Sequence, residues 1–113
     1  MGTTSNIVVT GLGFKPRLVK LTSLPTTAGT YIQLSTGAMT ADKQYCSSIG
    51  GSMSGSTTAG GRSSSTSAVL QYLSSTNGSV TTTVSKVSLD SDGFTIKCDN
   101  TSFAYDVAYE AWQ

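Results

Sequence analysis

Hydrophobic and polar residues alternate with a period of two along much of the chain. In the last quarter, Phe94, Ile96 and Cys98 alternate with polar neighbours, and a similar alternation runs through residues 103–112. A period of two places successive side chains on opposite faces of a β-sheet. Residues 90–93 and 99–102 are rich in Asp, Asn, Ser and Gly, which favour tight turns. The pattern therefore predicts three consecutive antiparallel strands between residues 86 and 112, covered by a second layer from the N-terminal strands.

Five further stretches carry strand patterns: residues 7–9, 17–24, 30–36, 68–73 and 79–89. Gly37 should end the third of them, and a short edge strand should follow it. In the last, the parity of the apolar positions changes between Val84 and Val87, which predicts a β-bulge near residues 85–86. Together the patterns predict an all-β fold, an antiparallel β-sandwich of about seven or eight short strands, as one domain spanning residues 1–113.

The strand pattern lapses over residues 41–67, where Gly, Ser and Thr dominate. We therefore expect a long Gly/Ser-rich loop here. Structureless connections of this length are uncommon inside a compact domain and are usually functional. Two interpretations stay open: the loop orders against a partner, with Tyr45, Met53 and Arg62 as contact residues, or it is a plain surface excursion.

Composition argues against several classes of function. Seven Lys and Arg residues balance six Asp and Glu residues, with no basic run, so we expect no nucleic-acid partner. The chain contains no histidine, which removes the usual general base and the commonest metal ligand. Asp106 and Glu110 share one face of a strand, but about 13 Å separates them, too far for a paired-carboxylate glycosidase. We expect no enzymatic activity, no cofactor and no metal.

The sequence shows neither a signal peptide nor a long apolar run, so no membrane partner is expected. Its two cysteines, Cys46 and Cys98, do not have the spacing of a redox motif. Free thiols in a protein made in a reducing cytoplasm are the simpler interpretation. A disulfide between the two stays open as the alternative.

Several residues have the chemistry of a ligand or partner contact. Aromatic faces can pack on sugar rings, while amide and guanidinium groups can bind sugar hydroxyls. A sugar site would draw on Tyr45, Tyr72, Trp112, Asp99, Asn100 and Arg62. Trp112 lies on the face of the last predicted strand opposite Tyr109. It either fills the edge of its own core or contacts a neighbouring subunit.

Three segments carry a family resemblance. Residues 8–20 are VVTGLGFKPRLVK, residues 87–96 are VSLDSDGFTI and residues 105–112 are YDVAYEAW. In combination they resemble small β-sandwich modules of tailed-bacteriophage structural proteins, which are found in tail fibres and at capsid surfaces. The final part is also similar to H-type lectin domains, whose closing hairpin carries a comparable Gly-Phe and ends in a strand with a tryptophan.

The resemblance implies a non-enzymatic virion protein, assembled in the host cytoplasm, that self-associates as a trimer and binds the major capsid protein or another virion protein. Capsid decoration is favoured over a fibre tip because strand patterns run from residue 7 to Trp112, leaving no shaft or coiled-coil segment. The alternative is a tail-fibre receptor-binding or H-type-lectin-like module that binds a host-surface glycan.

Overall fold

Nine β-strands and no helix make up the part of the chain that the structure describes. This computed structural model describes residues 5–24, 31–52, 59–73, 80–99 and 106–113. The strands are β1 (Ser5–Val9), β2 (Leu18–Leu24), β3 (Tyr31–Met39), β4 (Gln44–Ser52), β5 (Ala59–Ser65), β6 (Leu70–Leu73), β7 (Val80–Asp90), β8 (Gly93–Cys98) and β9 (Asp106–Trp112). The predicted all-β class is confirmed, with more strands than the sequence indicated.

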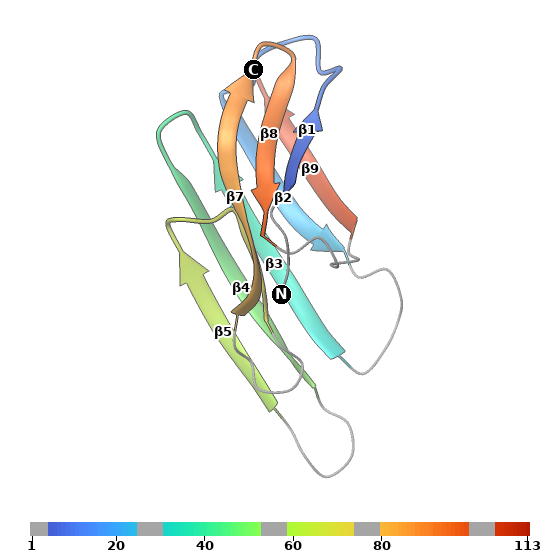
Figure 1. Cartoon of the computed structure of the whole chain (residues 1–113), viewed down its shortest axis with the longest axis vertical. Helices are drawn as coiled ribbons and strands as arrows, with labels where there is room; N and C mark the ends of the chain where they lie inside the picture. Colours follow the sequence, from blue (N-terminus) through green and yellow to red (C-terminus); the bar gives the residue numbers. More distant parts are fainter. Residues whose placement is uncertain (1–4, 25–30, 53–58, 74–79, 100–105) are drawn as a thin grey trace.

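The strands form two antiparallel sheets that pack as the layers of a sandwich (Figure 1). One sheet has the strand order β1-β8-β7-β6, and the other has the order β5-β4-β3-β2-β9. The molecule is elongated, with extents of 50 × 24 × 22 Å. Figure 1 shows the hairpin of β4 and β5 reaching past the four-stranded sheet at one end. Two stacked layers satisfy the requirement that each sheet cover the apolar face of the other.

The core lies between the two sheets. Its buried apolar side chains come from both layers: Val19, Leu21, Met39, Val69, Leu70, Tyr72, Val84, Phe94, Ile96 and Cys98. Phe94 of β8 meets Tyr109 of β9 edge to face, with 5.1 Å between the ring centroids, a favoured geometry for aromatic pairs. Burial of this apolar surface is the main force that holds the layers together.

The interior is lined by small polar side chains where β6 packs on β3 and β4. The hydroxyl oxygens of Ser35 and Ser48 lie 2.7 Å apart, and the Gln71 N–H donates to Ser35 Oγ at 3.0 Å. The Ser35 N–H in turn donates to Ser23 Oγ at 2.9 Å. These bonds join three strands of one sheet, β2, β3 and β4, to β6 of the other. They satisfy polar groups that would be costly to bury alone.

The predicted C-terminal unit of three strands is wrong in its last strand. β7 and β8 form the expected hairpin, with Asp90 and Gly93 as the last pair of the ladder. β9 instead pairs with β2 in the other sheet, where Trp112 is opposite Leu18. β8 already has β1 on one side and β7 on the other, so it has no free edge for β9. Apart from Asp99, the second predicted turn lies outside the described residues.

The expected loop at residues 41–67 is also wrong, because β4 and β5 occupy most of it. β4 pairs with β3 along its whole length, and β5 adds the next strand of the sheet. Gly50 pairs with Gly61 and Gly51 with Gly60. Most positions of both strands are Gly or Ser, so backbone hydrogen bonds define these strands and no apolar alternation marks them.

Gly37 lies inside β3 and does not end it. A Cβ atom on Gly37 would lie 1.8 Å from the carbonyl oxygen of Val69 and 2.6 Å from that of Tyr45. The glycine is required because the chain before β6 crosses β3 at this point. The separate edge strand expected after Gly37 is therefore part of β3, which runs to Met39.

The predicted β-bulge in β7 is present. The register between β7 and β8 shifts between Lys86 and Ser88, so Val87 is the extra residue, one position beyond the predicted site. Val84 before the bulge is buried, and Leu89 after it packs against the core. The bulge thus returns the following apolar residue to the inner face, as the change of parity requires.

Both cysteines are buried free thiols, Cys46 on the inner face of β4 and Cys98 at the end of β8. The free-thiol interpretation is confirmed. The two residues come from different sheets.

Candidate functional site

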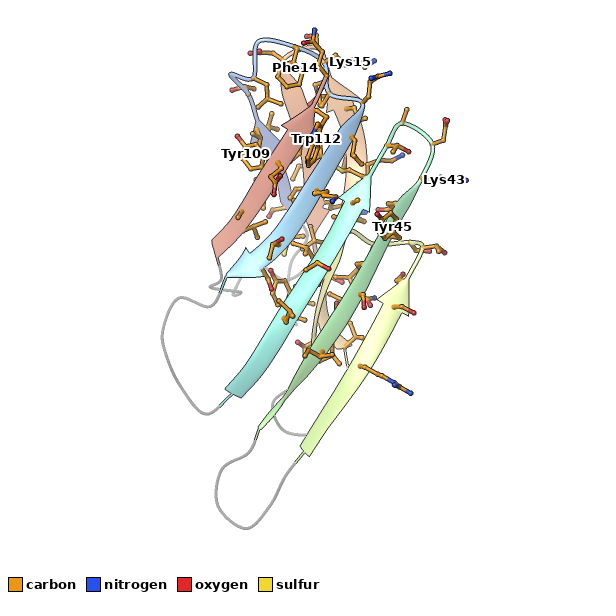
Figure 2. The ribbon with its side chains drawn as sticks, turned by 180° about the vertical axis from the view of Figure 1, so that it is seen from behind. Phe14, Lys15, Lys43, Tyr45, Tyr109 and Trp112 are labelled. Carbon is orange, nitrogen blue, oxygen red and sulfur yellow. The ribbon has the colours of Figure 1, made fainter. Side chains whose placement is uncertain are left out.

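We call the side of the five-stranded sheet that is turned away from the other layer the outer face. Strand register places Tyr45, Ala38, Lys20 and Glu110 in one row across it, from β4 to β9. Four large hydrophobic side chains of this face are 41–56 % exposed: Leu34, Tyr45, Ile49 and Trp112. Figure 2 shows Tyr45 and Trp112 on the same side of the molecule, on strands separated by β2 and β3. The outer face is therefore amphipathic, with opposite charges in its central row.

A hollow of about 390 Å³ opens on the outer face over β2 and β3. Its lining combines small, hydroxyl-bearing, charged and aromatic residues: Lys20, Leu21, Thr22, Thr36, Gly37, Ala38, Tyr45, Ala108, Tyr109 and Glu110. Ala38 points outward yet is only 1 % exposed, because the longer side chains of Lys20 and Tyr45 flank it in the row. The small residues thus form a floor, and the longer side chains form the walls.

Trp112 extends this surface beyond Lys20. The Lys20 ammonium nitrogen lies 5.6 Å from the centroid of the Trp112 ring, within the range of a cation–π interaction. The Arg17 N–H donates to the Trp112 carbonyl at 2.8 Å, and the Arg17 guanidinium donates to the Gln113 carbonyl at 3.1 Å. These bonds fix the end of β9 and hence the position of the indole. Trp112 lies outside the core, so the core-edge interpretation is wrong, and the subunit contact stays a prediction.

A second hollow, of about 460 Å³, lies beside the turn between β3 and β4. Its lining residues are Asp42, Lys43, Gln44, Tyr45, Thr66 and Lys86. The Lys86 ammonium donates to the carbonyls of Thr40 at 3.1 Å and Ala41 at 2.7 Å, while its N–H donates to the Gln44 side chain at 2.8 Å. Lys86 therefore ties the bulge of β7 to the opposite sheet, and Tyr45 borders both hollows.

The strand β1 offers a different kind of surface, a sheet edge. It pairs with β8 on one side without a break in register, and it ends the four-stranded sheet on the other (Figure 1). Ile7 is 46 % and Val8 is 61 % exposed. The strand carries no charged residue and no proline, the devices that commonly protect an edge. β1 therefore presents backbone donors and acceptors, flanked by apolar side chains, to a further strand.

Three of the six contact residues predicted from the sequence share the outer face. Tyr45, Trp112 and Arg62 are exposed there, and Arg62 pairs in register with Ile49. Tyr72 is wrong as a contact residue, because it is 1 % exposed and belongs to the core. Met53 and Asn100 lie outside the described residues.

The sequence did not identify Lys20, Glu110, Thr22 or Thr36 as parts of a site. They come together only because β2 pairs with β9 from the far end of the chain. Residues 17–24 were predicted as one strand, and Lys20 and Thr22, two positions apart, share a face of it; this was the available signal. The sequence does not show that β9 pairs with β2, so it could not show that Glu110 lies beside this face.

Among the described residues, no group of three or more His, Cys, Asp or Glu side chains is arranged to hold a metal ion. No helix in that part of the chain is long and apolar enough to cross a membrane. Comparison with known proteins finds no matching family model, no matching curated protein and no matching solved structure.

Proposed function

We propose that this chain is a non-enzymatic structural protein of a bacteriophage virion, which self-associates and binds the capsid surface as a decoration protein. The resemblance of three segments to phage β-sandwich modules supports the virion assignment, and the sandwich fold agrees with it. The observation that carries self-association is the exposed apolar edge strand β1. The major capsid protein, or another virion protein, is the second partner.

An unprotected edge is matched best by another strand, because strand addition satisfies its backbone groups. In an antiparallel pair centred on Ile7, Asn6 lies opposite Val8 of the partner subunit, and no charges oppose one another. Such a contact is isologous and gives a dimer. The trimer that the resemblance implies requires β1 of each copy to meet a different edge of the next copy, which closes a ring.

Size-exclusion chromatography with light scattering tests self-association through β1. The wild type should elute as an oligomer, and Val8→Lys should be monomeric because a charge on the edge opposes strand addition. Val87→Lys is the matched control, since Val87 is 46 % exposed on β7, which is not an edge strand. A mass of three chains supports the trimer, and a mass of two supports symmetric β1 pairing. A monomeric wild type at high concentration contradicts the proposal.

Co-sedimentation with empty tailed-phage capsids tests the decoration role. Binding in a fixed ratio to the capsid protein supports it. Absence of binding contradicts it and favours the alternative, a tail-fibre receptor-binding or carbohydrate-binding module. The hollow on the outer face is the specific observation that favours this alternative.

A further inference from the structure

The hollow on the outer face has walls of opposite chemical character. Tyr45, more than half exposed, stands on the β4 side, and Glu110 stands on the β9 side. These two strands are three strand spacings apart, about 14 Å. Lys20 of β2 stands between them in the same row, and the remaining floor is made of small residues of strands that have a neighbour on each side. The hollow therefore belongs to the folded sheet, and it is long enough for a short stretch of an extended ligand.

The polar groups of the hollow offer both donors and acceptors. The Lys20 ammonium donates hydrogen bonds, the Glu110 carboxylate accepts them, and the hydroxyls of Thr22 and Thr36 do both. A sugar ring has an apolar face of C–H groups and a belt of hydroxyls that donate and accept. The Tyr45 ring, and Trp112 beyond Lys20, suit the apolar face. The polar groups suit the hydroxyls.

The charges of the hollow favour a neutral ligand. Lys20 and Glu110 are direct partners in the β2–β9 register, so the hollow carries one positive and one negative charge side by side. An anionic glycan would be attracted by Lys20 but repelled by Glu110. A peptide is a poor fit for another reason: strand addition needs a free edge, and β2 and β3 are paired on both sides.

We propose that the hollow bounded by Tyr45 and Glu110 binds a short segment of a neutral glycan. This activity goes beyond capsid decoration, because it uses the outer face and leaves the β1 edge free for self-association. The two roles are separable by mutation. The Val8→Lys variant should lose self-association and keep glycan binding.

A glycan array with the purified full chain, followed by titration with the neutral glycans that bind, tests the proposal. Trp112 is the single tryptophan, so its fluorescence reports directly on a ligand next to Lys20. We expect saturable binding to neutral glycans with a change in Trp112 emission. Tyr45→Ala should weaken binding at least about tenfold, because it removes the stacking ring. Glu110→Gln should also weaken binding, because a neutral amide replaces an ionised acceptor, whose hydrogen bonds are stronger.

Ile49→Ala is the control, since Ile49 is exposed on the outer face but does not line the hollow. It should leave binding unchanged, and melting curves should show that all three variants are folded. Absence of binding to every neutral glycan on the array overturns the proposal. Binding confined to sialylated or sulfated glycans overturns it as well, as does binding that survives both Tyr45→Ala and Glu110→Gln.

Discussion

The Asp92 carboxylate accepts a hydrogen bond from the backbone N–H of Gly13, with 2.6 Å between Asp92 Oδ1 and the Gly13 nitrogen. Asp92 Oδ2 accepts a second bond from the Gly11 N–H at 3.0 Å, and the Asp92 carbonyl accepts one from the Leu12 N–H at 3.0 Å. Gly11 and Gly13 have φ values of 92° and 78°, which glycine adopts without steric cost. The β7–β8 turn therefore clamps the link between β1 and β2, which belong to different sheets.

Asp92→Ala should lower the free energy of unfolding by about 1–2 kcal/mol, because it removes an ionised acceptor from two backbone N–H groups. Asp92→Asn should cost less, since its amide keeps one acceptor oxygen. Urea unfolding followed by circular dichroism measures both. Ser91→Ala, in the same exposed turn, is the control and should behave like the wild type. An Asp92→Ala variant as stable as Ser91→Ala would show that the clamp does not stabilise the fold.

Gly37→Ala should be among the most damaging single substitutions in the chain. Its Cβ would overlap the carbonyl oxygen of Val69 at 1.8 Å, and backbone cannot rotate away as a side chain can. We expect a loss of at least about 3 kcal/mol, or failure to fold. Thermal unfolding measures the effect, with Ser47→Ala on the exposed face of β4 as the control. A melting temperature close to that of the control would refute the close crossing of the chain over β3.

Periodicity predicted which side chains face the core but not which strands are neighbours. Phe94 and Ile96 are buried as expected, because an apolar residue at every second position marks a covered face. The same pattern in β9 fits a place beside β8 or beside β2 equally well. The choice depends on which edges are free, and β1 had already taken the free edge of β8. That information is long-range and is absent from any local window of the sequence.

The site was only partly predictable for related reasons. Tyr45 and Tyr72 both lie in strands of the structure, yet one is exposed and the other buried, because only Tyr72 faces the opposite layer. β4 and β5 gave no signal, since Ser48 and Gly50 take inner positions that apolar residues usually fill. The sequence therefore could not predict the part of the outer face that β4 and β5 form, where Tyr45 lies.

Both thiols should resist a thiol reagent in the native protein. Cys46 and Cys98 are buried. Burial raises the pKa of the Cys46 thiol, although hydrogen bonds with Ser48 and the backbone of Ser65 lower it by less. Little thiolate is then present at neutral pH, and the thiolate is the reactive form. Labelling with a chromogenic disulfide reagent should therefore require unfolding, after which both thiols should react.

The control for thiol labelling is Ser64→Cys, because Ser64 is exposed on β5. Its new thiol should react with the reagent in the native protein without delay, while Cys46 and Cys98 should remain unlabelled. Rapid native labelling of either original cysteine, at the rate of the exposed control, would contradict their burial between the sheets.

Asp90 should make stability fall in acid. Its carboxylate accepts hydrogen bonds from the Ser88 hydroxyl at 2.6 Å and the Thr95 hydroxyl at 2.7 Å. These two hydrogen bonds hold the pKa of Asp90 below its ordinary value of 3.8, and the bond from Ser88 has the larger effect. Because the folded pKa lies below the unfolded one, this stabilisation is complete above the unfolded value and is lost as the pH falls through the folded pKa. Urea midpoints measured from neutral pH into this acid range should show the decline.

Asp90→Asn should flatten that acid decline, because the group no longer titrates, and Thr95→Val should reduce it by removing one of the two hydroxyl donors. Ser85→Ala, elsewhere on β7, should retain the decline of the wild type. The comparison depends on slopes against pH and not on absolute stability, so a general destabilisation by any of the substitutions does not affect it. If Asp90→Asn declines in acid as steeply as the wild type, the two hydroxyl bonds do not couple Asp90 to folding.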